Sequence, residues 1–138
     1  NRARVLDPGV AWVLGDALSH DFGRRFDLVA SIATLHHVPD LAAGLRRLAQ
    51  LTAPGGRLVV IGLARADRLV DLLPDLVAVP ANLARRAQRG YWQHTAPTCW
   101  PPPHSYTDVR RTVTAELPAA RYRRLLFWRY CVQWRKPA

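Results

Sequence analysis

Residues 26–63 read FDLVASIATLHHVPDLAAGLRRLAQLTAPGGRLVVIGL, and this stretch decides the fold. Residues 26–32 and 56–63 are nearly continuous apolar runs, which is typical of central strands in a parallel sheet covered on both faces. Between them, four leucines recur at helical spacing after Asp40, which is a suitable N-cap. Pro54 and the two glycines after it end the helix. The order strand, helix, strand predicts two parallel strands joined by a right-handed crossover.

The segments outside this unit complete an α/β pattern. Three further strands are predicted at residues 10–15, 122–127 and 130–134, with a tight turn near Trp128 and Arg129 between the last two. A helix is predicted at residues 107–117, with Thr107 as a plausible cap.

Residues 64–105 break the regular alternation of strands and helices. Residues 67–89 look helical, with interruptions at Pro74 and Pro80, because proline lacks the backbone donor that a helix interior needs. Residues 91–105 (YWQHTAPTCWPPPHS) are rich in proline and are predicted to form a loop with little regular structure.

Composition sets the outer limits of the interpretation. The length of 138 residues suits one domain or part of one, and no apolar run approaches the ~20 residues of a membrane span. Two cysteines make neither a disulfide framework nor a zinc site. The net charge of +10 comes mostly from scattered arginine doublets, which suit a solvated surface better than a dedicated nucleic-acid arm, although an anion-attracting face stays possible. We therefore expect a cytoplasmic protein with no membrane or nucleic-acid partner and leave its oligomeric state open.

The chemistry is expected at the carboxyl ends of the strands, because ligands of open α/β sheets bind there. Those ends carry GDA at residues 15–17, SIATLHHV at residues 31–38, and Gly62 with Leu63.

These motifs resemble the class I S-adenosylmethionine (SAM)-dependent methyltransferases. Three segments occur in the family's order and at its usual intervals: VLGDA, FDLVASIATLHHVPD and LTAPGGRLVV. The ending WRYCVQWRKP resembles the family more loosely. The resemblance implies a partial Rossmann-like α/β fold, with strands 3 to 7 of the usual seven and a helical, proline-rich insertion. Residues 1–138 would form a single partial methyltransferase domain in which residues 64–106 cover the substrate. The implied reaction is SAM-dependent methylation of a small molecule, with SAM as the cofactor and no metal.

The same resemblance assigns roles to particular residues. Asp16 would accept a hydrogen bond from the adenine amino group of SAM, with the backbone N–H of Ala17 facing the ring, and a carboxylate strengthens such a bond. The alternative is that Asp16 only caps the next helical turn. The cofactor's methionine and ribose side would pack along Ser31, Ile32 and Leu35.

His36 and His37 have two interpretations. One imidazole could act as a general base toward the methyl acceptor, and His37 is the candidate for that catalytic role. His36 is expected to pack beside the pocket. No base is required if alignment of acceptor and cofactor supplies most of the rate.

The loop at residues 91–105 offers two further candidates. His94, Cys99 and His104 could suggest a metal cluster, but their irregular spacing and flanking prolines argue against one. Tyr91, Trp92 and Trp100 could form an aromatic wall for a small organic acceptor, or a local core that orders the loop.

The family's glycine-rich G-x-G-x-G turn does not occur in the sequence, which also contains no Met and begins at Asn1. We therefore expect an N-terminally truncated fragment of a methyltransferase, inactive by itself, in which residues 26–32 form an exposed, aggregation-prone sheet edge. Two other hypotheses stay open at this point. One is a non-catalytic, arginine-rich module for RNA or an acidic partner on a degenerate methyltransferase fold, and the other is half of a nucleotide-binding dehydrogenase.

Overall fold

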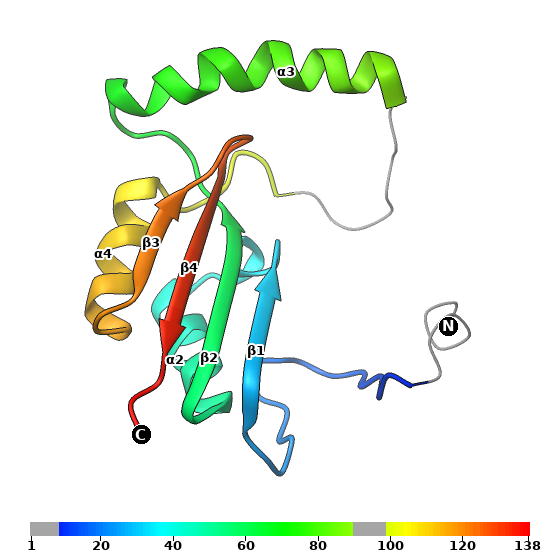
Figure 1. Ribbon diagram of the computed structural model, residues 1–138, viewed down its shortest axis with the longest axis vertical. Helices are drawn as coiled ribbons and strands as arrows, with labels where there is room; N and C mark the ends of the chain where they lie inside the picture. The colour runs from blue at the N-terminus through cyan, green and yellow to red at the C-terminus, as the bar shows by residue number, and fades with distance from the viewer. Residues whose placement is uncertain (1–8, 90–98) are drawn as a thin grey trace.

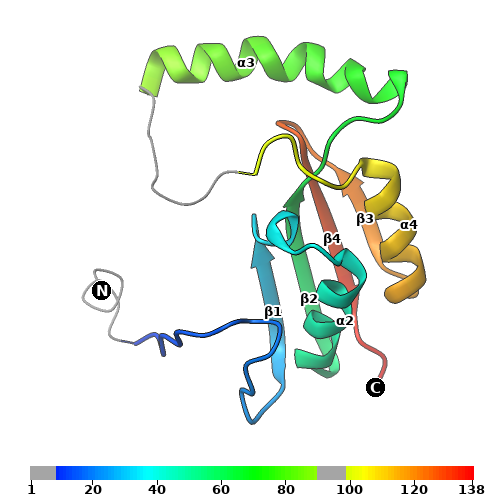
Figure 2. The ribbon, with the colours of Figure 1, turned by 180° about the vertical axis from the view of Figure 1, so that it is seen from behind.

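A four-stranded mixed sheet with helices on one face forms the centre of the molecule (Figure 1). The computed structural model describes residues 9–89 and 99–138. The strand order is β1-β2-β4-β3, so β1 and β3 lie at the two edges. Helices α2 and α4 cover the face turned to the viewer in Figure 2, whereas the face shown in Figure 1 has no helix of the described residues on it.

The stretch that decides the fold forms β1 (Phe26–Ile32), α2 (Leu41–Leu51) and β2 (Thr52–Leu63). β1 and β2 pair in parallel, with Val29 opposite Leu58, as predicted. Asp40 caps α2 by accepting a hydrogen bond of 2.9 Å from the Ala43 N–H. The pattern of apolar runs and the cap therefore predicted this unit correctly, although β2 begins at Thr52, directly after the helix.

The last two strands are β3 (Arg121–Arg124) and β4 (Arg129–Arg135). β4 is antiparallel to both β2 and β3, so β3 runs in the same direction as β1 and β2. Phe127 and Trp128 adopt positive φ angles of 61° and 58° in the turn between them, which confirms the expected turn. The four strands β1 to β4 correspond to the last four of the five expected. The partial Rossmann-like α/β fold class is confirmed.

The predicted strand at residues 10–15 is wrong. These residues form no strand, and the side chain of Leu14 is 98% exposed. A strand needs a neighbour for its backbone hydrogen bonds, and none of the described strands pairs with this segment.

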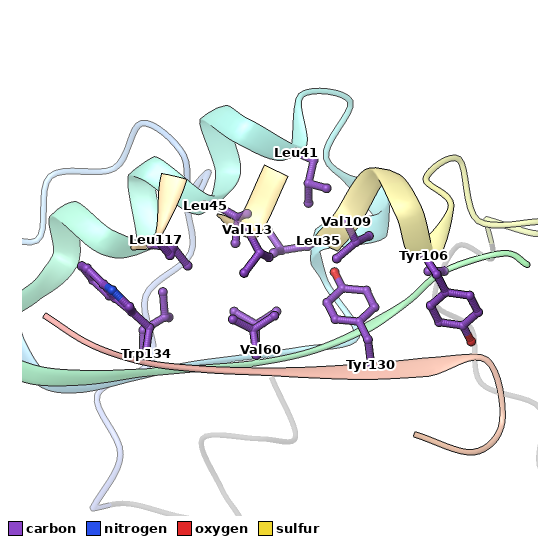
Figure 3. Packing of buried hydrophobic residues seen from close by; sticks show 13 residues of the cluster. Leu35, Leu41, Leu45, Val60, Tyr106, Val109, Val113, Leu117, Tyr130 and Trp134 are labelled. Carbon is purple, nitrogen blue, oxygen red and sulfur yellow. The ribbon is translucent and has the colours of Figure 1, made fainter. Parts of the chain in front are cut away.

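The core lies between the sheet and the two covering helices (Figure 3). Leu45 of α2 and Val113 of α4 meet Val60 of β2, and all three are almost fully buried. Burial of each such side chain contributes about 1.5–3 kcal/mol relative to leaving it in water. Trp134 of β4 closes one end of this core, and its indole N–H donates to the Pro118 carbonyl at 3.0 Å.

Helix α4 (Tyr106–Glu116) begins one residue earlier than predicted, because Ser105 and not Thr107 is its cap. Ser105 Oγ accepts from the Asp108 N–H at 3.1 Å, and Asp108 Oδ2 accepts from the Ser105 N–H at 3.1 Å. This reciprocal capping box satisfies two backbone donors that the helix end would otherwise leave unpaired.

The helical segment at residues 67–89 divides into a short 3-10 helix, η2 (Leu69–Leu72), and α3 (Leu73–Arg89). The expected interruption at Pro80 is wrong, because α3 runs through it. Proline removes one hydrogen bond to the carbonyl of Leu76, whose side chain is 71% exposed, so water can reach this side of the helix. α3 lies beyond the carboxyl ends of β1 and β2 (Figure 1).

β1 is an edge strand, as expected, and it carries apolar side chains on the face without helices. Leu28 is 61% exposed and Ile32 is 65% exposed. Both would be buried if another element covered this face.

Within residues 9–89 and 99–138, the structure contains no helix with the length and apolar character to cross a membrane.

Candidate functional site

The carboxyl end of β1 leads directly into a short 3-10 helix, η1 (Leu35–His37). Ala33 makes the turn with a φ of 52°, which is uncommon for a residue other than glycine. Its N–H donates to the Ile61 carbonyl at 2.7 Å, and the Thr34 hydroxyl donates to the Ile32 carbonyl at 3.0 Å. These two hydrogen bonds hold η1 against the sheet edge where ligands of α/β proteins bind.

The three residues predicted along the cofactor lie in different environments at this edge. Ser31 is buried on the helix-covered face, whereas Ile32 is exposed on the opposite face. Leu35 is 3% exposed, and it packs against Val38 and Gly44 in the core. The side chain of Leu35 is therefore part of the core and does not face a ligand at this edge.

The two histidines of η1 differ in burial. His36 is 6% exposed, and its Nδ1 atom is buried with no hydrogen-bond partner among the described residues. Burial, and then the neighbouring charge of His37, lower the pKa of His36, so the neutral imidazole is favoured. His37 is exposed, and the two ring centroids lie 4.0 Å apart. The packing role expected for His36 and the accessible position needed for a base at His37 both agree with this arrangement.

Asp16 and Ala17 lie in a turn away from the end of β1. Asp16 Oδ1 accepts from the Leu18 N–H at 2.9 Å and Oδ2 from the Ser19 hydroxyl at 3.2 Å, so this carboxylate caps its own turn. Arg47, in the middle of α2, donates to the Ala17 carbonyl at 3.3 Å. The structure thus brings residues 31–37 together at one edge and places Asp16 and Ala17 beside α2. The adenine contact stays a prediction.

Residues 99–105 pack over the same edge from a distant part of the sequence. Arg65, after β2, forms a parallel bridge with Ser105, and its N–H donates to the His104 carbonyl at 3.1 Å. His104 Nε2 lies 3.4 Å from the carbonyl oxygen of Val38, the residue after η1. This loop therefore lies beside the histidine pair.

An aromatic pair extends this edge. Trp100 is 61% exposed, and its ring meets that of Trp128 edge-on at a centroid distance of 5.4 Å. Trp128 O accepts from the Ala64 N–H at 3.0 Å, which holds the β3–β4 turn against the end of β2. The sequence left Trp100 as part of either an aromatic wall or a local core, and it missed Trp128, which it assigned only to a turn.

The remaining loop candidates are Tyr91, Trp92 and His94, which lie outside the described residues. Within residues 9–89 and 99–138, no group of three or more His, Cys, Asp or Glu side chains is placed to hold a metal ion. The described part of the site offers the exposed imidazole of His37, the buried neutral imidazole of His36 and the indole surface of Trp100 and Trp128. These groups can transfer a proton and bind an apolar molecule.

Comparisons with known proteins agree on one family. A family model described as a methyltransferase domain matches residues 1–60. An uncharacterised methyltransferase of Mycobacterium tuberculosis is 36% identical over 137 residues, and the match covers 99% of this chain and 69% of the relative. A probable tocopherol O-methyltransferase of Oryza sativa is 28% identical over 112 residues, covering 80% of this chain and 30% of that protein.

A solved structure shares the fold. The N-methyltransferase NodS from Bradyrhizobium japonicum, in complex with S-adenosylhomocysteine, superposes with a TM-score of 0.55 at 17% identity. The match covers 99% of this chain and 59% of that one. At this identity the likeness concerns the fold alone.

Proposed function

Because the chain belongs to the class I SAM-dependent methyltransferase family, we propose that it supports methyl transfer from SAM to a small-molecule acceptor at the carboxyl end of β1. The observation that carries this proposal is the exposed imidazole of His37, which follows β1 at the edge where ligands of such sheets bind. The dehydrogenase hypothesis is set aside by the family assignment.

Two separate groups of described residues are proposed to contact SAM. A carboxylate has about four acceptor positions, and Asp16 uses two of them within its turn. The exposed Asp16 can therefore still accept a hydrogen bond from the adenine amino group, with Ala17 beside it. At the end of β1, Ser31, Ile32 and Leu35 would lie along the rest of the cofactor.

His37 is proposed as the general base. SAM supplies an electrophilic methyl group when bound. The His37 imidazole takes the proton that the O–H or N–H group of the acceptor loses, and it is exposed enough to reach an acceptor. His36 is held neutral by burial, so it adds no positive charge beside the base.

The acceptor is proposed to be a small, largely apolar molecule. Residues 64–106 would cover it, since the part of this segment at residues 99–105 already packs over the sheet edge. Trp100 and Trp128 provide an indole surface there. The rice relative, named for methylation of a tocopherol, supports an acceptor of this kind.

The chain by itself is proposed to bind SAM only weakly, and to be inactive at micromolar SAM. Its sequence contains no G-x-G-x-G turn, which lets the backbone approach such a cofactor closely. Binding must offset at least ~4 kcal/mol of lost translational and rotational freedom. One hydrogen bond to a charged group contributes about 1–3 kcal/mol. The affinity should then be no better than roughly millimolar.

The test is methyl transfer from labelled SAM, at about millimolar concentration and above, to a panel of phenols, quinols and amines. We expect His37→Asn to lower the rate about 100-fold with SAM affinity nearly unchanged. His20→Asn is the matched control for the rate at saturating SAM, because His20 lies in the turn of Asp16, away from η1, and packs edge-on against Phe22. A loss below about fivefold in His37→Asn would assign His37 to packing. Micromolar SAM binding by the chain would contradict the weak-binding proposal alone.

A second candidate function rests on charge. Strand alternation places five exposed arginines on the face of the sheet that lacks helices: Arg57, Arg121, Arg123, Arg129 and Arg135. Arg57 and Arg135 are direct partners in the β2–β4 ladder. Like charges in that position repel, and a polyanion such as RNA would relieve the repulsion.

Binding of a generic RNA at several salt concentrations would test this alternative. A steep fall in affinity with salt, lost in Arg121→Gln/Arg123→Gln, supports RNA binding by this face. Affinity that depends little on these two arginines would reject it.

A further inference from the structure

A cavity of about 670 Å³ lies at the other edge of the sheet, away from the histidine pair. It opens between η2, α4 and the carboxyl end of β3. β1 and β3 are separated by two strands, so the cavity lies roughly 14 Å across the sheet from the end of β1. Its volume is in the range of small-molecule sites, and it lies apart from the histidine pair on which the methyl-transfer proposal rests.

The inner wall of this cavity is rigid and aromatic. Arg124 Nη1 donates to Asp71 Oδ1 at 2.8 Å, and its guanidinium lies 4.2 Å from the ring centroid of Tyr106. Both partners of this ion pair are largely buried, and the pair joins η2 to β3. Tyr122 packs beside them and stacks on Tyr130 at a centroid distance of 6.0 Å. The wall is therefore preformed, with the charge of Arg124 already balanced by Asp71.

Tyr122 contributes its ring, and not its hydroxyl, to the cavity wall. Its Oη atom is buried and has no hydrogen-bond partner among the described residues. Burial, and then the neighbouring Tyr106, raise the pKa of Tyr122 well above its usual range, so the hydroxyl keeps its proton. The Oη atom is closed off from the cavity, so a ligand there would meet the ring of Tyr122.

The rim of the cavity carries excess positive charge. Thr107, Arg110, Arg111 and Thr114 form one polar face of α4 toward the cavity, at helical spacing. Arg111 is paired with Asp108 at 3.1 Å, and Asp108 itself is engaged in the capping box.

The two other rim arginines have no carboxylate partner among the described residues. Arg68 and Arg110 are exposed, and neither side chain is paired with a carboxylate in the part of the chain that the structure describes. Guanidinium groups bind carboxylates and phosphates through paired hydrogen bonds.

We propose that this cavity binds a small aromatic anion, with its carboxylate or phosphate group on Arg68 and Arg110 and its ring against Tyr106 and Tyr122. The apolar lining includes Val70 and Ala115 as well as the tyrosine rings, so it suits a flat hydrocarbon body.

Calorimetry on the full chain tests the site with three probes of one shape: 2-naphthoate, 2-naphthyl phosphate and the neutral 2-naphthamide. We expect one or both anions to bind, and Arg68→Gln/Arg110→Gln to weaken them at least about tenfold. The control Arg121→Gln/Arg123→Gln removes the same charge from the opposite face of β3 and should change affinity less than about twofold. The anion that binds more tightly identifies the preferred group.

Tyr122→Phe is a second variant that keeps the fold, because the lost hydroxyl has no partner among the described residues. We expect it to change anion binding less than about twofold, because the ring that lines the cavity is kept and the lost hydroxyl is buried. Equal affinity for 2-naphthamide, an equal loss in the control pair, or no effect of Arg68→Gln/Arg110→Gln would overturn the proposal.

Discussion

Gly62 of β2 lies directly opposite Tyr130 of β4, and the tyrosine ring occupies the space that a Cβ atom at residue 62 would need. Tyr130 is 1% exposed and is enclosed by the core, and burial raises the pKa of its hydroxyl to about 12. The glycine is therefore required by a neighbour on another strand, because the ring cannot move away without disturbing the core.

Gly62→Ala should lower the free energy of unfolding by roughly 1–3 kcal/mol, the usual cost of forcing an extra carbon into a packed core. Urea denaturation of the variant measures this loss. In a Tyr130→Leu background the same substitution should cost much less, since the ring is gone. Equal costs in the two backgrounds would show that the clash does not determine the effect.

Stability should fall as the pH drops below about 6.5, in part because of His36. Burial lowers the pKa of His36 in the folded state, so the unfolded chain binds a proton more readily at mildly acidic pH. The contribution is fully present above the unfolded pKa and is lost as the pH falls toward the folded pKa.

His36→Leu should therefore flatten the dependence of stability on pH between about 7 and 5. Denaturation curves at several pH values compare it with the unchanged chain and with the control His20→Gln, because His20 packs against Phe22 and not against His36. An unaltered slope in His36→Leu would assign the pH dependence to other groups.

Lys136, the one lysine of the sequence, caps the C-terminal end of α2. Its Nζ donates to the carbonyls of Ala49 at 2.8 Å and Thr52 at 2.9 Å. A cation in this position satisfies unpaired carbonyls and complements the helix dipole. Lys136→Gln should lower the melting temperature, with a loss of about 1 kcal/mol, whereas Arg123→Gln should not. An equal effect of both substitutions would indicate a general response to charge.

Asp16→Ala should weaken SAM binding by about 1–3 kcal/mol if the carboxylate contacts adenine. Because Asp16 also caps its own turn, Asp21→Ala is the matched control: Asp21 Oδ1 accepts from the Gly23 N–H at 2.8 Å in a similar turn. NMR titration of the chain with SAM measures both variants. Equal losses in the two variants would leave Asp16 with its capping role alone.

Local sequence patterns predicted the elements that depend on local interactions. The apolar runs predicted β1 and β2, and the leucine spacing with Asp40 predicted α2, because each signal acts within a few residues. The same reasoning failed at residues 10–15, where strand-like composition has no partner among the described strands. It also chose Thr107 as a cap, although Ser105 forms the box with Asp108.

Some residues of the candidate site could likewise be predicted from local sequence, and others could not. Residues 31–37 could be predicted at a ligand-binding edge, because they follow a strand in a parallel unit. The sequence by itself thus determined the family and the parallel β1–β2 unit, through patterns read over short distances. Only the tertiary structure decided that Trp128 joins Trp100, that His36 is buried while His37 is exposed, and that Arg124 meets Asp71 from 53 residues away. Such contacts depend on how β3, β4 and α4 pack on the sheet, and no spacing along the chain encodes which distant side chains that packing brings together.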